Sequence, residues 1–332
     1  MKIGIVILNW NGKKLLEQFL PSVIEHSQAA TIYVADNAST DDSVAFVKKE
    51  FPEVRIIENK HNIGYAGGYN LALQSVPEDI FILLNSDVEV TQDWLVPILE
   101  TFEKEPGVAA IQPKILDFKN KNHFEYAGAA GGYIDKYGYP YCRGRIFQEI
   151  EQDHGQYNDD PYIFWASGAC IAIRRKVFFE AGGFDEDFFA HQEEIDLCWR
   201  IQNMGYRIKF VSESSVFHVG GATLNTLNPK KTYLNFRNGL FLLLKNLKSQ
   251  ELYKILFIRM ILDGLAAFRF IFSGKFQHFF AILKAHFSFY SQYSLMKKKR
   301  PNSFIINKYW DISSIVYQHF VLKKHRYTEL KK

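Results

Sequence analysis

The chain has 332 residues, of which 47% are hydrophobic and 23% are charged, and no tract of low complexity interrupts it. This composition is that of a globular protein and excludes a disordered or fibrous chain. The length suits one large α/β domain with an appendage, or two modest domains.

The formal charge of +4 is small, but the excess is local. Residues 297–300 read Lys-Lys-Lys-Arg, and five more cations occur in the last ten residues. A basic C-terminal segment suits an anionic surface such as a phospholipid leaflet, although a solvated chain end is an equal alternative on charge alone. The chain also contains 29 Phe, 18 Tyr and 5 Trp, which can fill a core, stack on sugar rings or lie at a membrane interface.

The cysteines and the N-terminal residues indicate a cytoplasmic protein. Cys142, Cys170 and Cys198 are odd in number and far apart, without the spacing of metal ligands, which suits a reducing compartment. The chain begins with one basic residue and a short strand-like run, 3–8, and this pattern is too short for a signal peptide. We therefore expect a cytoplasmic location.

The first third of the chain alternates between strand and helix patterns. Apolar, β-branched runs predict strands at 3–8, 31–35, 54–57 and 80–84, and apolar spacings of three and four predict helices at 13–26, after 42 and around 70–74. Residues 39–42, Ser-Thr-Asp-Asp, offer N-cap side chains to the second helix. This alternation predicts an α/β fold with a mostly parallel sheet covered by helices on both faces.

The rest of the chain changes character twice. Residues 106–160 are rich in Gly and Tyr, which predicts hairpins and a loop over the site. We then expect a strand at 164–173, a short helix at 176–181, a longer helix at 193–204 and strands at 208–211 and 216–218. From about 229 onward the pattern is helical. We therefore divide the chain into an α/β domain, 1–228, and a helical C-terminal region, 229–332.

Polar clusters follow three of the predicted strands, at 9–11, 36–37 and 85–87. In open α/β sheets, ligands bind beyond the carboxyl ends of the strands, and all three clusters lie there. The sequence therefore predicts a binding site at this edge of the sheet.

Several sequence fragments occur in a set order between residues 3 and 240. They are Ile-Val-Ile-Leu-Asn-Trp-Asn-Gly (5–12), Val-Ala-Asp-Asn-Ala-Ser-Thr-Asp (34–41), Asn-Ile-Gly-Tyr-Ala-Gly-Gly-Tyr-Asn (62–70), Leu-Leu-Asn-Ser-Asp-Val (83–88), Gly-Gly-Phe-Asp-Glu-Asp-Phe-Phe (182–189) and Glu-Glu-Ile-Asp-Leu-Cys-Trp-Arg (193–200). Together they resemble the family-2 glycosyltransferases, particularly the rhamnosyltransferase-like branch that builds bacterial surface polysaccharides. The resemblance implies a GT-A-like, Rossmann-type fold, a catalytic domain at 1–228 and a hexosyltransferase activity that uses a nucleotide-sugar donor.

The resemblance places the nucleotide against the strand ends and a Gly-rich loop. In the family, a residue in the position of Asp36 accepts the imide N–H of uracil or thymine, whereas the residues alone suggest that Asp36 begins an Asx-turn; both can hold together. The Gly-rich loop precedes a helix, where the backbone can approach phosphate, although it lacks the dinucleotide fingerprint and is weak alone. The other nucleotide-site candidates share a place at a strand end or in this loop: Asn9, Asn11, Asn62, Gly64, Gly67, Asn85 and Ser86.

The resemblance also implies a divalent cation, Mg²⁺ or Mn²⁺, held against the diphosphate of the donor. The family commonly has Asp-x-Asp at 85–87, and this chain has Asn85, a departure that is also typical of the rhamnosyltransferase-like branch. Asp87 must therefore do most of the holding, and Glu89 and His218 are further candidate ligands. Considered alone, an Asp at a strand end is more often a cap, and an isolated His is more often structural.

Glu193 and Glu194 begin a predicted helix at the place where the family carries its catalytic base. By position the base is Glu194, one methylene longer than the usual Asp, although the assignment between Glu194 and Glu193 stays open. The helix N-terminus favours the ionised form, which can take a proton from an acceptor hydroxyl. Ordinary first-turn charge is the alternative. Asp196 and Arg200, four residues apart, indicate a structural pair.

Trp165, Ser167 and Gly168 resemble the segment that lines the donor and acceptor pocket of the family. A Trp face suits the apolar C–H face of a sugar. Packing of Trp165 in the core is an equal alternative.

The C-terminal region contains an apolar segment, 252–272, with four charged residues. At about 100° per residue, Lys254, Arg259, Asp263 and Arg269 fall in one half of the helical wheel, and apolar residues such as Phe257 fill the other. We interpret the segment as an amphipathic helix on the cytoplasmic face of the inner membrane, not a spanning one. Packing on the catalytic domain, or in a homodimer, is the alternative.

These inferences lead to one expected function and two alternatives. We expect an inverting glycosyltransferase that moves a sugar from a dTDP- or UDP-sugar, with dTDP-rhamnose one candidate, to a hydroxyl of a lipid-linked cell-surface polysaccharide. Its partners are the donor, the glycan or lipid-linked acceptor and the membrane surface, with no nucleic acid. The first alternative is a sugar-binding scaffold that has lost activity. It stays open because Asn85 and Glu194 differ from the residues that the family usually has at these positions. A nucleotidyltransferase is weaker, because residues 9–14 lack a Gly-rich triphosphate loop.

Overall fold

The computed structural model describes residues 1–220, 228–301, 304–306 and 308–330. Its first elements are β1 (Ile3–Asn9), α1 (Lys13–His26), β2 (Ala30–Asp36), α2 (Ser43–Glu50), β3 (Arg55–Glu58), α3 (Gly64–Leu73), β4 (Ile80–Asn85), β5 (Val88–Val90), α4 (Leu95–Lys104) and β6 (Val108–Asp117). A region of short strands follows, with β7 (Gly132–Ile134), β8 (Pro140–Cys142), β9 (Arg145–Ile146), β10 (Glu149–Ile150) and β11 (Tyr162–Ile163). The remaining elements are β12 (Cys170–Arg174), α5 (Arg175–Glu180), α6 (Glu193–Asn203), β13 (Arg207–His218), α7 (Pro229–Asn246), α8 (Ser249–Phe272) and α9 (Phe276–Lys298).

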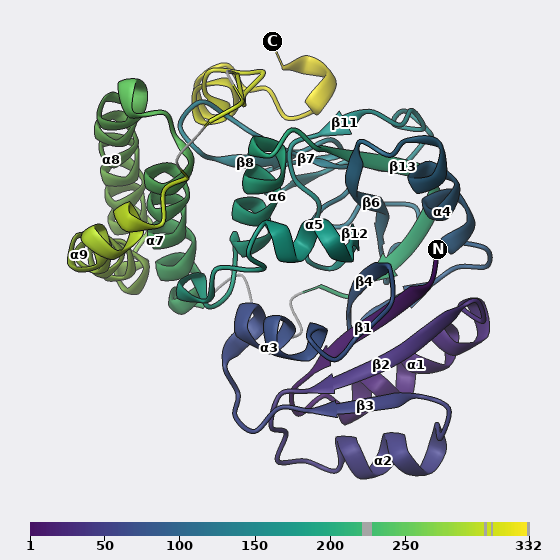
Figure 1. Ribbon diagram of the computed structural model, residues 1–332. Helices are drawn as coiled ribbons and strands as arrows, with labels where there is room; N and C mark the ends of the chain where they lie inside the picture. Colours follow the sequence, from purple (N-terminus) through teal and green to yellow (C-terminus); the bar gives the residue numbers. More distant parts are fainter. Residues whose placement is uncertain (221–227, 302–303, 307, 331–332) are drawn as a thin grey trace.

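Within these described residues, nine strands form one mixed sheet in the order β11-β13-β6-β12-β4-β1-β2-β3, with β5 beside β13 (Figure 1). Six of them, β1, β2, β3, β4, β6 and β13, run in one direction, and β5, β11 and β12 run against them. A second, antiparallel sheet joins β10, β9, β8 and β7. The predicted α/β fold with a mostly parallel sheet flanked by helices is therefore confirmed.

The alternation of side chains along β1 buries both faces of the main sheet. Ile5 and Ile7 pack into a core shared with α1 and α4, whereas Val6 packs into a second core shared with α3, α6 and α7. Burial of a large aliphatic side chain contributes about 1.5–3 kcal/mol. A strand buried on both faces is therefore a continuous apolar run, which is why it can be recognised in the sequence.

The boundaries of several elements differ from the prediction. The helix expected at 70–74 is α3, which already begins at Gly64. The segment 164–173 is a strand only from Cys170, and the two strands expected at 208–211 and 216–218 are one strand, β13, with a register shift between Val211 and Ser215. Polar residues at such a bulge imitate a strand end in the sequence. In α3, tight packing on β1 overrides the low helix propensity of glycine, because a Cβ at Gly68 would lie 3.0 Å from Leu8.

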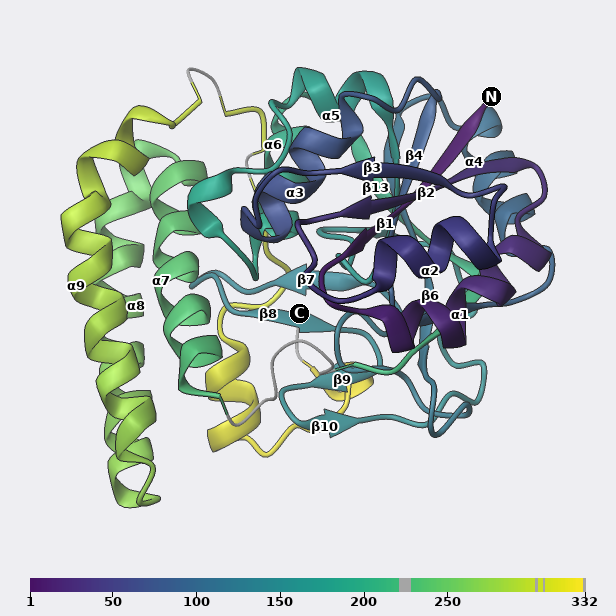
Figure 2. The same cartoon turned by 90° about the horizontal axis from the view of Figure 1, so that it is seen from below.

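The C-terminal helices continue from the α/β core. Leu240 and Phe241 of α7 lie in the same core cluster as Ile195 of α6. α8 and α9 form a hairpin beside α7, and both helices extend past the sheet (Figure 2). After α9 the chain returns to the second sheet, where Ile312 packs against Tyr141. The helical C-terminal region thus begins near residue 229 as predicted, but α7 packs as part of the core of the α/β domain.

α8 does not separate charged residues on its exposed side from apolar residues on its buried side, because Lys254 and Arg269 are exposed whereas Arg259 and Asp263 are buried. Arg259 and Asp263 are buried and paired at 2.8 Å, and the Tyr139 hydroxyl donates to Asp263 Oδ1 at 2.8 Å. Several large apolar residues of the helix, Phe257, Ile261 and Phe268, are exposed. A buried charge pair is tolerated when its hydrogen bonds are satisfied, as they are here between α8 and the 137–139 turn. No helix in the described ranges has the length and hydropathy to cross a membrane.

Candidate active site

The carboxyl ends of β1, β2 and β4 meet at one edge of the sheet, as the sequence predicts. Asn9 is in register with Asp36, and Leu8 is in register with Asn85. The Asn9 side-chain amide donates to Asp36 Oδ1 at 3.0 Å, and both side chains are buried. The polar clusters that follow the three strands therefore belong to one site.

Asp36 forms the Asx-type turn that its sequence context suggests. Its Oδ2 accepts from the Ser39 backbone N–H at 2.9 Å, so each carboxylate oxygen already has a donor. Asn11 ties the same turn to the end of β1, because its Oδ1 accepts from the Thr40 N–H at 2.7 Å. Contact of Asp36 with a nucleobase stays a prediction, and it would use the remaining lone pairs of this carboxylate.

The Gly-rich loop holds its own backbone through Asn62 and Asn37. Asn62 Oδ1 accepts from the Gly64 N–H and from the Asn37 amide, each at 3.0 Å. The next N–H, that of Tyr65, donates to the Phe189 carbonyl at 3.2 Å. These two N–H groups at the start of α3 therefore have acceptors within the protein. Gly64 is required here, since its φ is +78° and a Cβ would lie 3.0 Å from Phe189. A Cβ at Gly67 would likewise lie close to the side chain of Ile63.

Asp87 and His218 come together although they are far apart in the sequence. β5 pairs with β13, and this pairing sets His218 opposite Val88. Asp87 Oδ1 and His218 Nε2 are 3.1 Å apart, both side chains are buried, and the Asn85 amide lies 3.4 Å from the same ring nitrogen. The structure thus brings together two of the predicted metal ligands with Asn85. Ser86, which lies between Asn85 and Asp87 in the chain, is half-buried.

Glu125 is part of this cluster and was missed by the sequence reasoning. Its Oε2 lies 3.1 Å from His218 Nδ1 and accepts from the Ala127 N–H at 2.6 Å. Burial alone would lower the pKa of His218, but the contacts with Asp87 and Glu125 outweigh it and raise this pKa to about 10. Glu125 lies in the 106–160 segment, where no local pattern singles it out.

The pair formed by Asp87 and His218 fits a divalent cation that takes further ligands from its substrate. Among the described residues, no group of three or more His, Cys, Asp or Glu could hold a metal ion. Mg²⁺ is commonly held by one or two protein ligands together with phosphate oxygens and water, which suits a two-residue site. The carboxylates of Asp87 and Glu125, one at each ring nitrogen of His218, also favour positive charge at this place. Glu89 is not brought to the pair, because its carboxylate engages Lys121.

Glu193 and Glu194 begin α6, and neither Oε2 atom has a hydrogen-bond partner among the described residues. Burial raises the pKa of both carboxyl groups, and the charge of Glu194 raises that of Glu193 further. Burial therefore outweighs the helix N-terminus. Glu193 is buried and Glu194 is half-buried, so Glu194 is the more accessible of the two. Asp196 pairs with Arg200 at 2.8 Å, as predicted.

Tyr65 links the carboxylate pair to the other parts of the site. Its hydroxyl donates to the Gly168 carbonyl at 2.8 Å. Burial raises the pKa of Tyr65, and the charges of Tyr69, Glu193 and Glu194 raise it further. The neighbouring carbonyl of Ala169 accepts from the Asn85 N–H at 3.0 Å. One short segment therefore lies between the carboxylates of α6 and the end of β4.

The predicted pocket residues differ in their accessibility. Trp165 is buried, and its indole N–H donates to the Tyr133 carbonyl at 2.8 Å, so the structure shows core packing. Ser167 is also buried, with its N–H bound to Gln112 Oε1 at 2.9 Å. Gly168 is half-buried, and its carbonyl accepts from the Tyr65 hydroxyl.

Comparisons with known proteins show the family and the fold of the chain. The model of Glycosyl transferase family 2 matches residues 4–181. The N-acetylglucosaminyl-diphospho-decaprenol L-rhamnosyltransferase of Mycobacterium tuberculosis is 26% identical over 235 residues, which are 65% of this chain and 75% of the relative. A low-salt glycan biosynthesis hexosyltransferase of Haloferax volcanii is 22% identical over 284 residues, which are 83% of this chain and 87% of the relative.

Two solved structures show the same fold. A mannosyltransferase from Pyrobaculum calidifontis in complex with GDP-Man and Mn²⁺ has a TM-score of 0.52 at 16% identity, over 88% of this chain and 75% of that chain. GalNAc-T7 with UDP, GalNAc and Mn²⁺ has a TM-score of 0.56 at 19% identity, over 78% of this chain and 54% of that chain. This chain thus spans about half of the GalNAc-T7 chain. At these identities the likeness establishes a GT-A-like fold.

Proposed function

The chain belongs to glycosyl transferase family 2 and is a glycosyltransferase, and on this basis we propose that it transfers a sugar from a nucleoside diphosphate with inversion of configuration. The donor is a dTDP- or UDP-sugar, with dTDP-rhamnose the first to test, and the acceptor is a hydroxyl of a lipid-linked surface polysaccharide. The relative in Mycobacterium tuberculosis, named for an L-rhamnosyl transfer and a diphospho-decaprenol, supports this choice.

The observation that carries the proposal is the placement of two pairs at one edge of the sheet. Asp87 follows β4 and lies beside His218 at the end of β13, the Glu193 and Glu194 pair begins α6, and the charges of that pair act on Tyr65, whose hydroxyl donates to the Gly168 carbonyl. A cation-holding pair next to a carboxylate of raised pKa can serve both a departing diphosphate and an attacking hydroxyl. This division of roles is what an inverting transfer needs.

In the proposed mechanism, Asp87 would hold Mg²⁺ or Mn²⁺ against the diphosphate, together with His218 Nε2 once this nitrogen has lost its proton. When bound, the cation supplies positive charge that offsets the charge of the departing nucleoside diphosphate. Glu194 accepts the proton of the acceptor hydroxyl as its oxygen attacks the anomeric carbon from the face opposite the diphosphate. The bond from this carbon to the diphosphate oxygen breaks, and the anomeric configuration inverts. Glu125 holds the His218 ring with Nε2 towards Asp87.

Removal of the divalent cation tests this proposal. Purified protein is incubated with UDP-, dTDP- and GDP-sugars and Mn²⁺, and release of the nucleoside diphosphate is measured. We expect EDTA to reduce turnover by at least about 10²-fold, because charge on the leaving group is then uncompensated, and excess Mn²⁺ or Mg²⁺ to restore it. Turnover that persists in EDTA contradicts the metal-dependent mechanism, and retention of configuration in the product contradicts inversion. Calorimetric binding without turnover identifies a scaffold.

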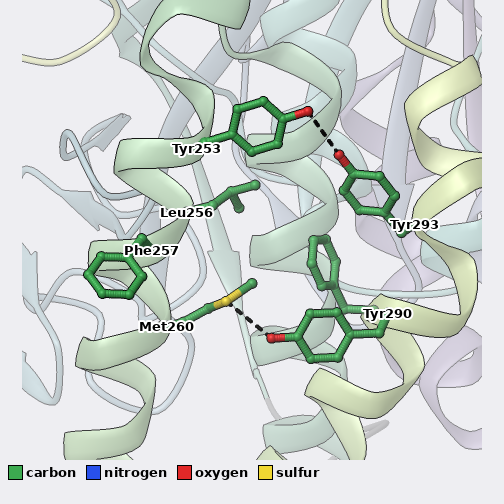
Figure 3. Close-up of a pocket in the computed structure, with 7 residues that line it drawn as sticks. Tyr253, Leu256, Phe257, Met260, Tyr290 and Tyr293 are labelled. Carbon is green, nitrogen blue, oxygen red and sulfur yellow. Dashed lines mark hydrogen bonds between the residues drawn. The ribbon is translucent and has the colours of Figure 1, made fainter.

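The exposed face of the hairpin formed by α8 and α9 supports attachment to a membrane surface. Phe257, Phe272 and Phe287 are 66%, 87% and 73% exposed, and they belong to a stripe with spacings of three and four along each helix. A hollow of about 480 Å³ lies between α8 and α9 beside Phe257 (Figure 3), and it is lined by Tyr253, Leu256, Phe257, Met260, Phe289, Tyr290 and Tyr293. Apolar faces of this size on a protein surface mark contact with another apolar phase.

The charges around this face favour an anionic leaflet. Residues 249–298 are all described, and their exposed acidic side chain is Glu251, whereas Asp263 is buried. The exposed cations on the same stretch are Lys254, Arg269, Lys275, Lys284, Lys297 and Lys298. Lysine and arginine beside exposed phenylalanines are typical of helices that lie in the interface of a membrane. We therefore place the enzyme on the cytoplasmic face of the inner membrane, where a lipid-linked acceptor is available.

Vesicle binding measures this attachment. The double substitution Phe257→Glu and Phe268→Glu is expected to weaken binding to vesicles of phosphatidylglycerol and phosphatidylethanolamine by at least about tenfold, because two large apolar side chains no longer enter the lipid. Val96→Glu on α4, which changes a 49% exposed apolar residue elsewhere, is the matched control. Unchanged sedimentation with vesicles contradicts the attachment. A dimer that the double substitution dissociates, seen by ultracentrifugation, assigns the face to a second copy instead.

A further inference from the structure

The segment that precedes the carboxylate pair has an unusual backbone. Phe189, His191 and Gln192 have φ angles of 65°, 69° and 69°, in the left-handed region that side chains other than glycine rarely adopt. Such a conformation persists only where neighbouring groups determine it. Gln192 is followed directly by Glu193 and Glu194, so the path of this segment determines where α6 begins.

The side chain of Asn238, on α7, holds this segment through its carbonyl groups. The Asn238 amide nitrogen donates to the carbonyls of Phe188, Ala190 and His191, at 3.0, 2.9 and 2.7 Å. Asn238 is completely buried. Three carbonyl groups of one short segment thus converge on a single buried donor.

Arg237 orients this donor and adds contacts of its own. Its Nε donates to Asn238 Oδ1 at 2.9 Å, which turns the amide nitrogen of Asn238 towards the segment. Its Nη2 donates to the carbonyls of Asp187 and Phe188, at 2.9 and 3.0 Å. The two side chains of α7 therefore hold the backbone carbonyls of Asp187, Phe188, Ala190 and His191.

The opposite side of the segment rests on the start of α3. The Phe189 carbonyl accepts from the Tyr65 N–H at 3.2 Å, and a Cβ at Gly64 would lie 3.0 Å from the same residue. The segment is thus enclosed between α7 and the loop that precedes α3. Because the Oε2 atoms of Glu193 and Glu194 have no hydrogen-bond partner in the described part of the chain, their direction depends on this backbone.

We propose that Arg237 and Asn238 are positioning residues for the catalytic carboxylate: they hold residues 187–192 in the conformation that directs Glu193 and Glu194 at the acceptor hydroxyl. The inference rests on the proposed function, because it takes this pair as the source of the base. Both residues lie beyond the 4–181 stretch that matches the family model. α7 thereby completes the site, which explains why Arg237 and Asn238 are buried in an otherwise apolar core.

Substitution of Asn238→Asp tests the positioning role, because it keeps the shape and removes the donor. We expect kcat to fall by about 10²-fold, since displacement of a catalytic group by about 1 Å has an effect of this size. The KM of the donor should stay within about threefold, because the donor-side residues are unchanged. Hydrogen exchange of the peptide that covers 187–194 should become faster, while exchange in β1 and β4 stays as in the wild type. Gln250→Glu, at an exposed amide on α8, is the control for the added charge.

A second variant keeps the test decisive if Asn238→Asp does not fold. Arg237→Lys is expected to show the same pattern with a smaller fall in kcat, since lysine lacks the planar group that contacts Asn238 and two carbonyls at once. Wild-type kcat with unchanged exchange at 187–194 overturns the proposal. A parallel loss of kcat, donor affinity and protection throughout the molecule also overturns it, because it shows a purely structural role. A wild-type chain that transfers no sugar contradicts the proposed function. The exchange measurement needs no substrate, so it reports separately on the contacts that Arg237 and Asn238 make with residues 187–192, which we call the clamp.

Discussion

Replacement of Glu194 by glutamine is expected to reduce kcat by about 10²- to 10⁴-fold, the usual contribution of a general base. The substitution keeps the size of the side chain and removes its ability to accept the hydroxyl proton. Because burial raises the pKa of Glu194, we also expect the wild-type rate to fall with decreasing pH at a higher pH than an exposed glutamate would give. Initial rates between pH 5 and 9 with saturating donor measure both effects.

Two comparisons distinguish loss of the base from damage to the fold. A buried carboxylate is more costly to ionise in the folded state than in the unfolded state. The free energy of unfolding therefore falls as the pH rises from the ordinary glutamate pKa to the raised pKa of the folded state. Glu194→Gln should therefore be at least as stable as the wild type at pH 8, as measured by thermal unfolding. Glu193→Gln should retain more activity, because Glu193 is less accessible. The reverse order of the two variants would move the base to Glu193.

Replacement of Asp87 by asparagine is expected to weaken Mn²⁺ binding in the presence of nucleoside diphosphate by at least about tenfold and to abolish most turnover. Asp87 is the carboxylate that lies beside His218 Nε2, at 3.1 Å, and Asn85 cannot replace its charge. Calorimetry with Mn²⁺ and the nucleotide measures the first effect, and release of the nucleoside diphosphate measures the second. Wild-type affinity in this variant would show that the cation is held elsewhere.

Glu89→Gln is the matched control for Asp87→Asn. The residue lies two positions along the chain, and the spacing in the sequence suggests it as a ligand, but its carboxylate engages Lys121. We therefore expect near-wild-type Mn²⁺ affinity in Glu89→Gln. A loss as large as that of Asp87→Asn would support the ligand role that the sequence suggests.

The main features of the fold and half of the site follow from patterns in short stretches of sequence. Strands such as β1 and β4 are apolar runs that end in polar residues, and the edge where they meet can be inferred because parallel strands share their carboxyl ends. The cluster that contains Asp87 follows from this reasoning, whereas the Glu193 and Glu194 pair, at the start of a helix, follows from the resemblance of the ordered motifs to the family.

Other features depend on packing that no short stretch reveals. The helical wheel of residues 252–272 groups four charged residues in one half, but it cannot show which of them face the protein. Arg259 and Asp263 face inward because Tyr139 and the backbone of the 137–139 turn satisfy them, and Phe257 is left exposed. Similarly, α3 begins earlier than its residues suggest, because its glycines fit closely against β1.

Local patterns were sufficient for the α/β architecture, the family and most of the residues proposed to act on the donor and the acceptor. Three features came only from the folded chain: the contact of Glu125 with His218, the clamp of Arg237 and Asn238 on the segment before Glu193, and the exposed face of α8 and α9. The physical reason is the same in each case. A periodic pattern records whether a side chain is buried or exposed along its own element, whereas these features depend on which distant residue lies against it.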